Sequence, residues 1–543
     1  MKKTTFFNLI LIVVSSVLFS TTSLYAQTPA PSWSSCLGGV GRDEFWSVCP
    51  VGTGANNKNV LMAGFSTSSG LNTYDTLDTL GNGAGDAILH KKDNDGNDVF
   101  LNNYGGIQGE MFYKAVELAD KGYLAIGVTF SPFPGFHGGT DVFVVKTDSS
   151  GNEIWKKVYG GTGGEEARDV CVIGDTAFLF GATNSNNFDF PGNHGDIDAF
   201  ILKIRVSSGA FISSELFGGT SIDRFQSGCV LSNGNLVGSG LTNSTDGDLV
   251  TAGGHPNSSG WVYDMFTLCA SQNLDIQWAK CVGSNTGGEH VSSMVVINDH
   301  IFIAGTCGPW EDGDVTHTLG GTYDAALAKL DTADGNLHWF KTFGGSLNEY
   351  DPIVKESVSG NLFFGFSSES SDSQLTVNNG LYDESVFLLD LNGGIQWTNT
   401  FGGAEDDWLR DILPGDMDDY ITVGSTRGSH PGYLGGFMDA LLVGSYFPFQ
   451  RQSMLVATNL VNNELTKLIN IYPNPTLDKI RITLPPETTN NTVTIYNLSG
   501  QVLFSERTSE VIYITDLAQF AQGTYVVEVK NSKGVFRDRV QKL

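Results

Sequence analysis

The chain has 543 residues, of which 67 are glycine, 40% are apolar, 11% are aromatic and only 17% are charged. This aromatic content excludes a disordered chain, because enough apolar surface is present to form a core. The formal net charge of −28 argues against a protein that binds nucleic acid or anionic lipid, because an acidic surface repels such ligands. Abundant glycine with few charged residues favours many short strands joined by turns.

The N-terminus has the pattern of an export signal. Lys2 and Lys3 precede an apolar run from Phe6 to Phe19, and small residues follow up to Ala26. We therefore predict a secretory signal peptide over residues 1–26, with the mature chain beginning at Gln27. No other apolar stretch approaches the roughly 20 residues that a transmembrane helix needs. The sequence thus predicts an exported protein without such a helix.

A pair of glycines preceded by an aromatic or apolar residue recurs along most of the chain. Seven copies occur at intervals of 55 to 67 residues, with a single glycine in the fifth copy. Self-similarity at a fixed period is typical of repeat architectures. The glycines are Gly38-Gly39, Gly105-Gly106, Gly160-Gly161, Gly218-Gly219, Gly283, Gly344-Gly345 and Gly402-Gly403.

Each copy contains the pattern of four short strands. An apolar strand follows the glycines, a tight turn leads to a second strand, a long Ser/Asn/Gly loop follows, and a hairpin joins the third and fourth strands. Four strands in each repeat of this length are typical of a propeller blade. The third strand of every copy begins with an aspartate: Asp86, Asp141, Asp198, Asp264, Asp324, Asp383 and Asp439.

The two ends of the repeat region complement each other. The seventh copy stops after its third strand, while Ser32 to Leu37 form an isolated fourth strand before the first full copy. We expect this N-terminal strand to complete the last blade, which leaves no unpaired sheet edge between the two ends. The predicted fold is all-β: a seven-bladed β-propeller over residues 27–449, closed by the N-terminal strand.

Several segments within the repeats are similar to a known family. Thr183 to Pro191, the strand from Asp198 to Lys203, Gly139 to Lys146 and the join from Trp155 to Gly161 resemble the bacterial seven-bladed β-propeller family often called SBBP repeats. The resemblance covers about residues 32–449. It implies the propeller fold, but it implies no activity, because that family offers no shared catalytic residues to carry over.

A different module follows a polar linker over residues 450–469. Its strands alternate with Pro, Asn and Gly, which predicts a small Ig-like β-sandwich over residues 470–543. The Tyr472-Pro473-Asn474-Pro475 start, the turn from Ile495 to Val502 and the segment from Gly523 to Val527 resemble the type A C-terminal sorting domain of the type IX secretion system. The resemblance implies a Bacteroidetes-type bacterium, the type IX machinery and its sorting peptidase as partners, and release or attachment at the cell surface. The alternative is an ordinary Ig-like adhesive domain.

Acidic residues recur on the face of the propeller that carries the long loops. One acid follows each glycine pair, and the aspartate of the third strand adds a second in every blade. A ring of carboxylates could hold Ca²⁺ or a hydroxyl-rich ligand. Repetition in every blade instead favours a structural role, in which each carboxylate accepts backbone N–H groups. The candidate metal ligands are Asp43, Glu110, Glu165, Asp223, Glu289, Glu349 and Asp407.

The long loops also contain histidines and aromatic residues, and these are typical of surfaces that stack against sugars and form hydrogen bonds with them. The alternative is that scattered loop histidines are simply solvated. The candidate ligand-binding residues are His137, His194, Trp261, Trp310, His317 and His430.

The sequence contains no HExxH, GxSxG or P-loop motif and no His/Cys cluster with metal-ligand spacing. We therefore predict no catalytic residues and no cofactor beyond Ca²⁺. The favoured function is a secreted or cell-surface module that binds an extracellular glycan or protein. The alternative is a secreted polysaccharide-degrading enzyme that uses carboxylates on the long-loop face.

Overall fold

The computed structural model divides into two compact units, with the division between Val456 and Ala457. It describes residues 33–38, 41–52, 59–68, 85–93, 96–254, 263–375, 377–415, 419–427 and 439–444 of the first unit. In the second unit it describes residues 470–472, 479–483, 491–497, 502–508, 512–531 and 534–542. The predicted signal peptide and linker lie outside these residues and stay predictions, as do the domain boundaries.

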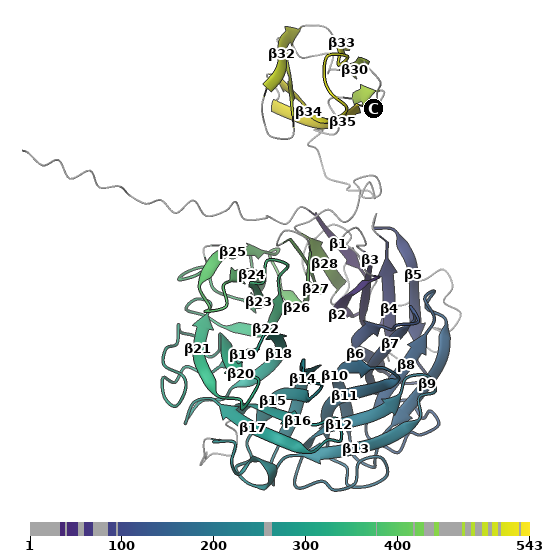
Figure 1. Ribbon diagram of the computed structural model, residues 1–543, viewed down its shortest axis with the longest axis vertical. Helices are drawn as coiled ribbons and strands as arrows, with labels where there is room; N and C mark the ends of the chain where they lie inside the picture. The colour runs from purple at the N-terminus through teal and green to yellow at the C-terminus, as the bar shows by residue number, and fades with distance from the viewer. Residues whose placement is uncertain are drawn as a thin grey trace, which may run out of the picture. The chain divides into compact units, whose positions relative to one another are not determined.

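The described part of the first unit forms seven four-stranded antiparallel sheets arranged in a ring, as a β-propeller requires (Figure 1). The first three sheets contain β2 (Asp43–Val51), β3 (Asn59–Ser66), β4 (Asp86–Lys92) and β5 (Asp98–Tyr104); β6 (Glu110–Glu117), β7 (Tyr123–Thr129), β8 (Asp141–Thr147) and β9 (Glu153–Tyr159); and β10 (Glu165–Ile173), β11 (Thr176–Thr183), β12 (Asp198–Arg205) and β13 (Phe211–Phe217).

The next three sheets repeat this order, and a short 3-10 helix, η2 (Gly247–Leu249), follows the second strand of the first of them. They contain β14 (Asp223–Val230), β15 (Leu236–Thr242), β16 (Asp264–Ala270) and β17 (Ile276–Val282); β18 (His290–Ile297), β19 (His300–Cys307), β20 (Asp324–Asp331) and β21 (Leu337–Phe343); and β22 (Glu349–Glu356), β23 (Leu362–Ser368), β24 (Asp383–Leu389) and β25 (Ile395–Phe401).

The N-terminal strand closes the ring, as the sequence predicted. The last sheet has the order β1 (Trp33–Leu37), β28 (Asp439–Gly444), β27 (Tyr420–Thr426) and β26 (Asp407–Pro414). Within it, β1 pairs antiparallel with β28, so that Ser35 lies opposite Leu442. One apolar cluster contains Phe45 and Met62 of the first sheet together with Val423 of the last sheet. The two ends of the repeat region therefore share both a sheet and a core.

The packing follows from the composition of the strands. Every residue of β7 and β8 is buried, because these central strands contact the sheets on both sides. In the outer strand β9, by contrast, Glu153, Ile154 and Lys157 are exposed. Apolar clusters fill the spaces between consecutive sheets; one contains Phe112 and Phe143 with Leu61 and Leu89. Such burial is the main stabilising contribution in a fold of this kind.

The second unit has two antiparallel sheets around one core, as the predicted sandwich requires. One sheet has the order β29 (Asn470–Tyr472), β30 (Lys479–Thr483) and β33 (Ile512–Asp516); the other has the order β32 (Val502–Thr508), β31 (Asn491–Tyr496), β34 (Gly523–Asn531) and β35 (Gly534–Lys542). Ile480 and Ile482 of the first sheet pack with Val493 and Val527 of the second. Lys542 Nζ donates hydrogen bonds to the carbonyl oxygens of Leu517, Ala518 and Phe520 near the end of the chain.

The described residues include no helix that is long and apolar enough to cross a membrane.

Candidate functional site

The first strand of every sheet carries an irregularity at the same place, next to the axis of the propeller. In β2 the pairing register shifts between Phe45 and Ser47, and the other six first strands shift at the corresponding point. A β-bulge of this kind redirects the extra residue. The redirected residues Trp46, Tyr113, Arg168, Gln226, Ser292 and Arg410 all line one cavity of about 760 Å³. This channel is the candidate functional site.

Charged side chains inside the channel join blades that are far apart in sequence. Asp411 Oδ1 lies 2.8 Å from Lys355 Nζ, and its Oδ2 lies 3.8 Å from Lys114 Nζ. The same Oδ2 accepts a hydrogen bond of 3.0 Å from the N–H of Val48. Burial alone would raise the pKa of Asp411, but the two lysines lower it below the ordinary value. Asp411 is therefore an ionised link between four blades.

Arginine side chains cover aromatic rings elsewhere in the channel. The guanidinium of Arg168 lies 3.9 Å from the ring centre of Tyr113, and that of Arg410 lies 4.5 Å from the ring centre of Trp46. Arg168 also pairs with Glu166 at 2.8 Å. These cation–π contacts and ion pairs hold the side chains of the channel wall in place.

Aromatic side chains form a continuous arc at the end of the channel where the first and third strands begin, which we call the mouth. They alternate between the residue directly before a third strand and the residue directly after the repeated acid of the next copy. Successive ring centres lie 5.4, 6.4, 5.6, 5.8 and 4.4 Å apart. All six are half-buried, and we call them the crescent: Tyr263, His290, Tyr323, Tyr350, Tyr382 and Trp408.

The crescent covers only part of the mouth. In the first, second and third sheets the residue before the third strand is not aromatic; it is Gly85, Thr140 and Ile197, respectively. In that half, Glu166 pairs with Arg224 of the next sheet at 3.0 Å. The mouth therefore has an aromatic side and a polar, charged side.

The acids that follow the glycine pairs lie in hydrogen-bond networks of their own turns. Glu165 Oε2 accepts the N–H of Gly161 at 2.7 Å, and its Oε1 accepts the hydroxyl of Thr183 at 2.6 Å. Glu110 has the same pattern with Gly106 and Thr129, at 2.8 and 2.7 Å. Comparable bonds from backbone N–H or hydroxyl groups reach Asp43, Asp223, Glu289, Glu349 and Asp407, and all seven carboxylates are buried.

These hydrogen bonds are the ones expected if the repeated acids stabilise the turns of the propeller. Among the described residues, no three of these seven carboxylates lie close enough to share one ion. The turns also explain the repeated glycine, because a Cβ at Gly105 would collide with the carboxylates of both Asp86 and Glu110. Whether any of the acids holds Ca²⁺ stays a prediction.

The aspartates of the third strands lie beside these acids, so that carboxylates meet in pairs between blades. Asp141 accepts the N–H of His137 at 2.8 Å, while its other oxygen is buried without a hydrogen-bond partner. Burial first, and then the neighbouring Glu165, raises the pKa of Asp141 to about 7. Burial likewise raises the pKa of Glu349 to about 8, although Ser368 and Ser370 donate hydrogen bonds to it. Burial also raises the pKa of Asp223 and of Asp324, in each case to about 6.

We expect these paired acids to make the propeller less stable in alkaline solution. Their pKa values are higher in the folded protein than in the unfolded chain, so their contribution is complete below about pH 4 and is lost as the pH rises through 6 to 8. Each unit of pKa difference corresponds to about 1.4 kcal/mol. The melting temperature should fall by about 5 °C or more between pH 5.5 and pH 9, measured by calorimetry.

Glu349→Gln tests the source of this effect. Glutamine keeps the acceptor oxygen but cannot ionise, so the variant should gain stability relative to the parent chain at pH 9 and match it near pH 5. Glu405→Gln, at an exposed position, is the control and should leave the profile unchanged. If stability depended on pH identically in the parent chain and in Glu349→Gln, ionisation of Glu349 would not be a source of the alkaline loss of stability.

Four of the six predicted loop residues lie in the described part of the chain, and none of these four lines the channel. The ring of His137 stacks on Phe188 at 4.0 Å, His194 contacts Asp198 at 2.7 Å, and His317 contacts Glu311 at 3.3 Å. Trp310 is 48% exposed. Trp261 and His430 lie outside the described residues. A role for these six in ligand binding stays a prediction.

The channel residues and the crescent were not predicted. A signal was present, because the positions one and three residues after each repeated acid carry Trp, Tyr, Arg or His in most copies. A second signal was the tyrosine that directly precedes Asp264, Asp324 and Asp383 in three of the copies.

The second unit is similar to a known domain family. Residues 470–542 match the secretion system C-terminal sorting domain. This domain indicates export through the type IX secretion system to the cell surface or beyond, as the sequence predicted, and implies interaction with that machinery. The signal peptide, the bacterial group and the resemblance of the propeller to SBBP repeats stay predictions.

No curated protein matches the chain. Among solved structures, it is similar to PorZ, a bacterial surface component of the type IX secretion system of Porphyromonas gingivalis, with 12% identity and a TM-score of 0.37 over 93% of this chain. The chain spans 60% of PorZ. It is also similar to Kuenenia stuttgartiensis hydrazine synthase, with 10% identity and a TM-score of 0.41 over 74% of this chain and 95% of that one. A protein of unknown function from Dyadobacter fermentans matches with 9% identity and a TM-score of 0.40, over 76% and 98% of the two chains.

Proposed function

We propose that the propeller is an exported binding module that holds a neutral, hydroxyl-rich ligand, such as an extracellular oligosaccharide, at the mouth of its channel. The observation that carries the proposal is the crescent. Its rings form an arc of five successive contacts, and Tyr323 and Tyr350 border the cavity. Aromatic rings of this kind offer apolar faces together with polar edges, which suit the faces and hydroxyl groups of sugar rings.

The charge of the channel supports a neutral ligand. Four basic and three acidic side chains line the cavity, and the acids Asp351 and Asp411 each contact a basic partner. The third acid, Asp169, accepts hydrogen bonds from Ser227 Oγ and Gly228 N–H at 2.9 and 3.0 Å. A strongly charged ligand would have to displace these pairs, whereas hydroxyl groups can share their remaining donors and acceptors.

The same contacts favour binding over catalysis. A glycosidase needs two carboxyl groups that face the substrate, one as the acid and the other as the base or nucleophile. Among the described residues, the acids whose pKa burial raises, such as Asp141 and Glu349, do not line the cavity. The carboxylates that line the cavity are engaged by lysine, arginine, hydroxyl or backbone groups.

The proposal is tested by measuring the binding of neutral oligosaccharides to the full mature chain and to two crescent variants. Tyr350→Ala and Trp408→Ala should each weaken binding about tenfold, because an aromatic contact contributes about 0.5–1.5 kcal/mol beyond the area it buries. Trp310→Ala removes an exposed aromatic residue outside the cavity and should leave the affinity unchanged.

If Trp310→Ala weakened binding and the two crescent variants did not, the ligand would lie on the loops and the proposal would be contradicted. It would also be contradicted if none of the oligosaccharides bound to the parent chain. Each variant is first shown to have the melting temperature of the parent chain. Repeating the measurement in EDTA tests the separate prediction that the acid ring holds Ca²⁺.

A further inference from the structure

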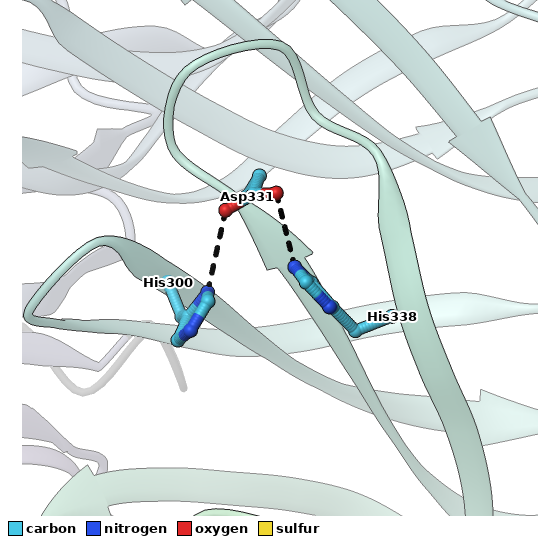
Figure 2. A group of neighbouring side chains, drawn as sticks. All are labelled: His300, Asp331 and His338. Atoms are coloured by element: carbon cyan, nitrogen blue, oxygen red, sulfur yellow. Dashed lines mark ion pairs between the residues drawn. The ribbon is translucent and has the colours of Figure 1, made fainter.

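Two histidines and an aspartate meet at the end of the fifth sheet opposite to the mouth. His300 is the first residue of β19, Asp331 is the last residue of β20, and His338 lies near the start of β21. Asp331 stands between the two imidazoles, with one carboxylate oxygen toward each (Figure 2). The three side chains are between 29% and 43% exposed, so solvent reaches the cluster.

The pairing of the strands produces this meeting. His300 lies directly opposite Asp331 in the β19–β20 ladder. A bulge in the β20–β21 ladder, between Lys329 and Leu330, leaves His338 as the extra residue beside them. The sheet therefore presents all three side chains at one place although they come from three strands.

The cluster departs from the repeat. In the preceding sheet the equivalent positions hold Asn235, Ser271 and Gln277, and in the following sheet they hold Asn361, Asp390 and Gln396. Both neighbours thus have asparagine and glutamine where this sheet has its two histidines. The repeat fold does not require the histidines, so their presence needs another explanation.

The aspartate is also used differently here. In the following sheet, Asp390 accepts N–H groups of its hairpin, from Asn392 at 2.8 Å and Gly394 at 2.9 Å. In the fifth sheet, Asp334 accepts the hairpin N–H of Asn336 at 3.0 Å. Among the described residues, the side-chain partners of Asp331 are the two imidazoles, and no backbone N–H of the hairpin occupies its carboxylate.

The distances match those around a transition-metal ion. Asp331 Oδ1 lies 3.5 Å from His300 Nδ1, and Asp331 Oδ2 lies 3.0 Å from His338 Nε2. Two donors bound to Zn²⁺ at 2.0–2.1 Å with a tetrahedral angle lie about 3.3 Å apart. One donor atom from each of the three residues lies within 4.8 Å of the others. His300 Nδ1 is buried from solvent without a hydrogen-bond partner, and a bound ion would satisfy it.

We propose that His300, Asp331 and His338 bind one divalent transition-metal ion, for which Zn²⁺ is the probe. Two imidazoles and one carboxylate suit zinc and its neighbours, whereas Ca²⁺ and Mg²⁺ prefer oxygen ligands alone. Three protein ligands leave coordination positions for water or for a donor group of a partner. The site lies at the opposite end of the propeller from the mouth, and it does not depend on the proposed saccharide binding.

The experiment titrates the full mature chain, produced without a histidine tag and treated with EDTA, with ZnCl₂ in a calorimeter. Co²⁺ serves as a spectroscopic probe of the ligand set. We expect one saturable equivalent of Zn²⁺, a rise in melting temperature on Zn²⁺ addition, and visible Co²⁺ absorption that Zn²⁺ abolishes.

His300→Asn/His338→Gln copies the residues of both neighbouring sheets and should fold with an unchanged metal-free melting temperature while losing all three signals. Asp331→Asn should weaken binding at least about tenfold, because even partners that only orient metal ligands contribute 10- to 100-fold to affinity. His317→Asn, which alters an exposed histidine elsewhere, should bind as the parent chain does. The proposal is overturned if the parent chain shows no saturable equivalent, or if the double variant keeps it.

Discussion

Replacing Asp411 with asparagine is expected to lower the free energy of unfolding of the propeller by about 3 kcal/mol or more. Asp411 is 3% exposed and is the anion between Lys355 and Lys114, which come from the sixth and second sheets. Asparagine can still accept the N–H of Val48, but it leaves the ammonium groups of Lys355 and Lys114 without the carboxylate that pairs with them. Removing one partner of a buried ion pair lowers the free energy of unfolding by more than the intact pair adds to it, because the other charge stays buried without its partner.

Burial lowers the pKa of Lys355, and Asp411 opposes that effect. The variant should therefore shift Lys355 further toward its neutral form, so that its loss of stability is smaller at pH 10 than at pH 7. Chemical denaturation at the two pH values measures this difference.

The matched control is Asp169→Asn, at the equivalent position of the third sheet. Asp169 accepts hydrogen bonds from Ser227 and Gly228, and no lysine lies within ion-pair distance of it among the described residues. Its replacement should cost about 1 kcal/mol, as the loss of ordinary hydrogen bonds does. Equal losses in the two variants would show that Asp411 does not hold the lysines.

Removal of the N-terminal strand should be comparably damaging. A chain that begins at residue 39 lacks β1 and exposes the edge of β28, and it also loses the apolar contacts of Cys36 and Leu37 with the cores beneath them. Five paired residues, at about 1 kcal/mol of net hydrogen-bond stabilisation each, together contribute about 3–5 kcal/mol. The exposed strand should also promote aggregation.

A chain that begins at residue 27 is the control, because it keeps β1 intact. Thermal unfolding followed by circular dichroism should show a lower melting temperature for the shorter chain alone. Equal melting temperatures for the two chains would mean that β1 does not complete the last sheet.

The fold could be predicted because its signals recur. The glycine pairs and the third-strand aspartates repeat in the sequence, and the missing fourth strand of the seventh copy predicted how the ring closes. The structure adds the reason for the first glycine of the pair: at Gly402, as at Gly105, a side chain would collide with two carboxylates. Local patterns of this kind are visible without any knowledge of long-range contacts.

The site could not be predicted in the same way, because it depends on which residues differ between the copies. Tyr350 and Trp408 occupy equivalent positions in consecutive repeats, yet nothing local indicates that they converge with Tyr382 at one mouth. The bulge in each first strand directs Arg168 and Arg410 into the channel, and hydrophobic alternation does not reveal a bulge. The histidines of the fifth sheet meet only through strand register. The long loops contain more histidines than any other part of the repeat, so their sequence favours that surface instead.

The channel and its mouth exist only if the chain closes into a ring through its N-terminal strand, and a cysteine cross-link tests this most directly. Ser35 and Leu442 lie opposite each other in the β1–β28 ladder. In the variant Ser35→Cys/Leu442→Cys, mild oxidation should yield a peptide linked between these positions, identified by mass spectrometry. Ser35→Cys/Val443→Cys is out of register by one residue, which places the two side chains on opposite faces of the sheet, and should not form the link. A link in neither variant, or equally in both, would contradict the closed ring.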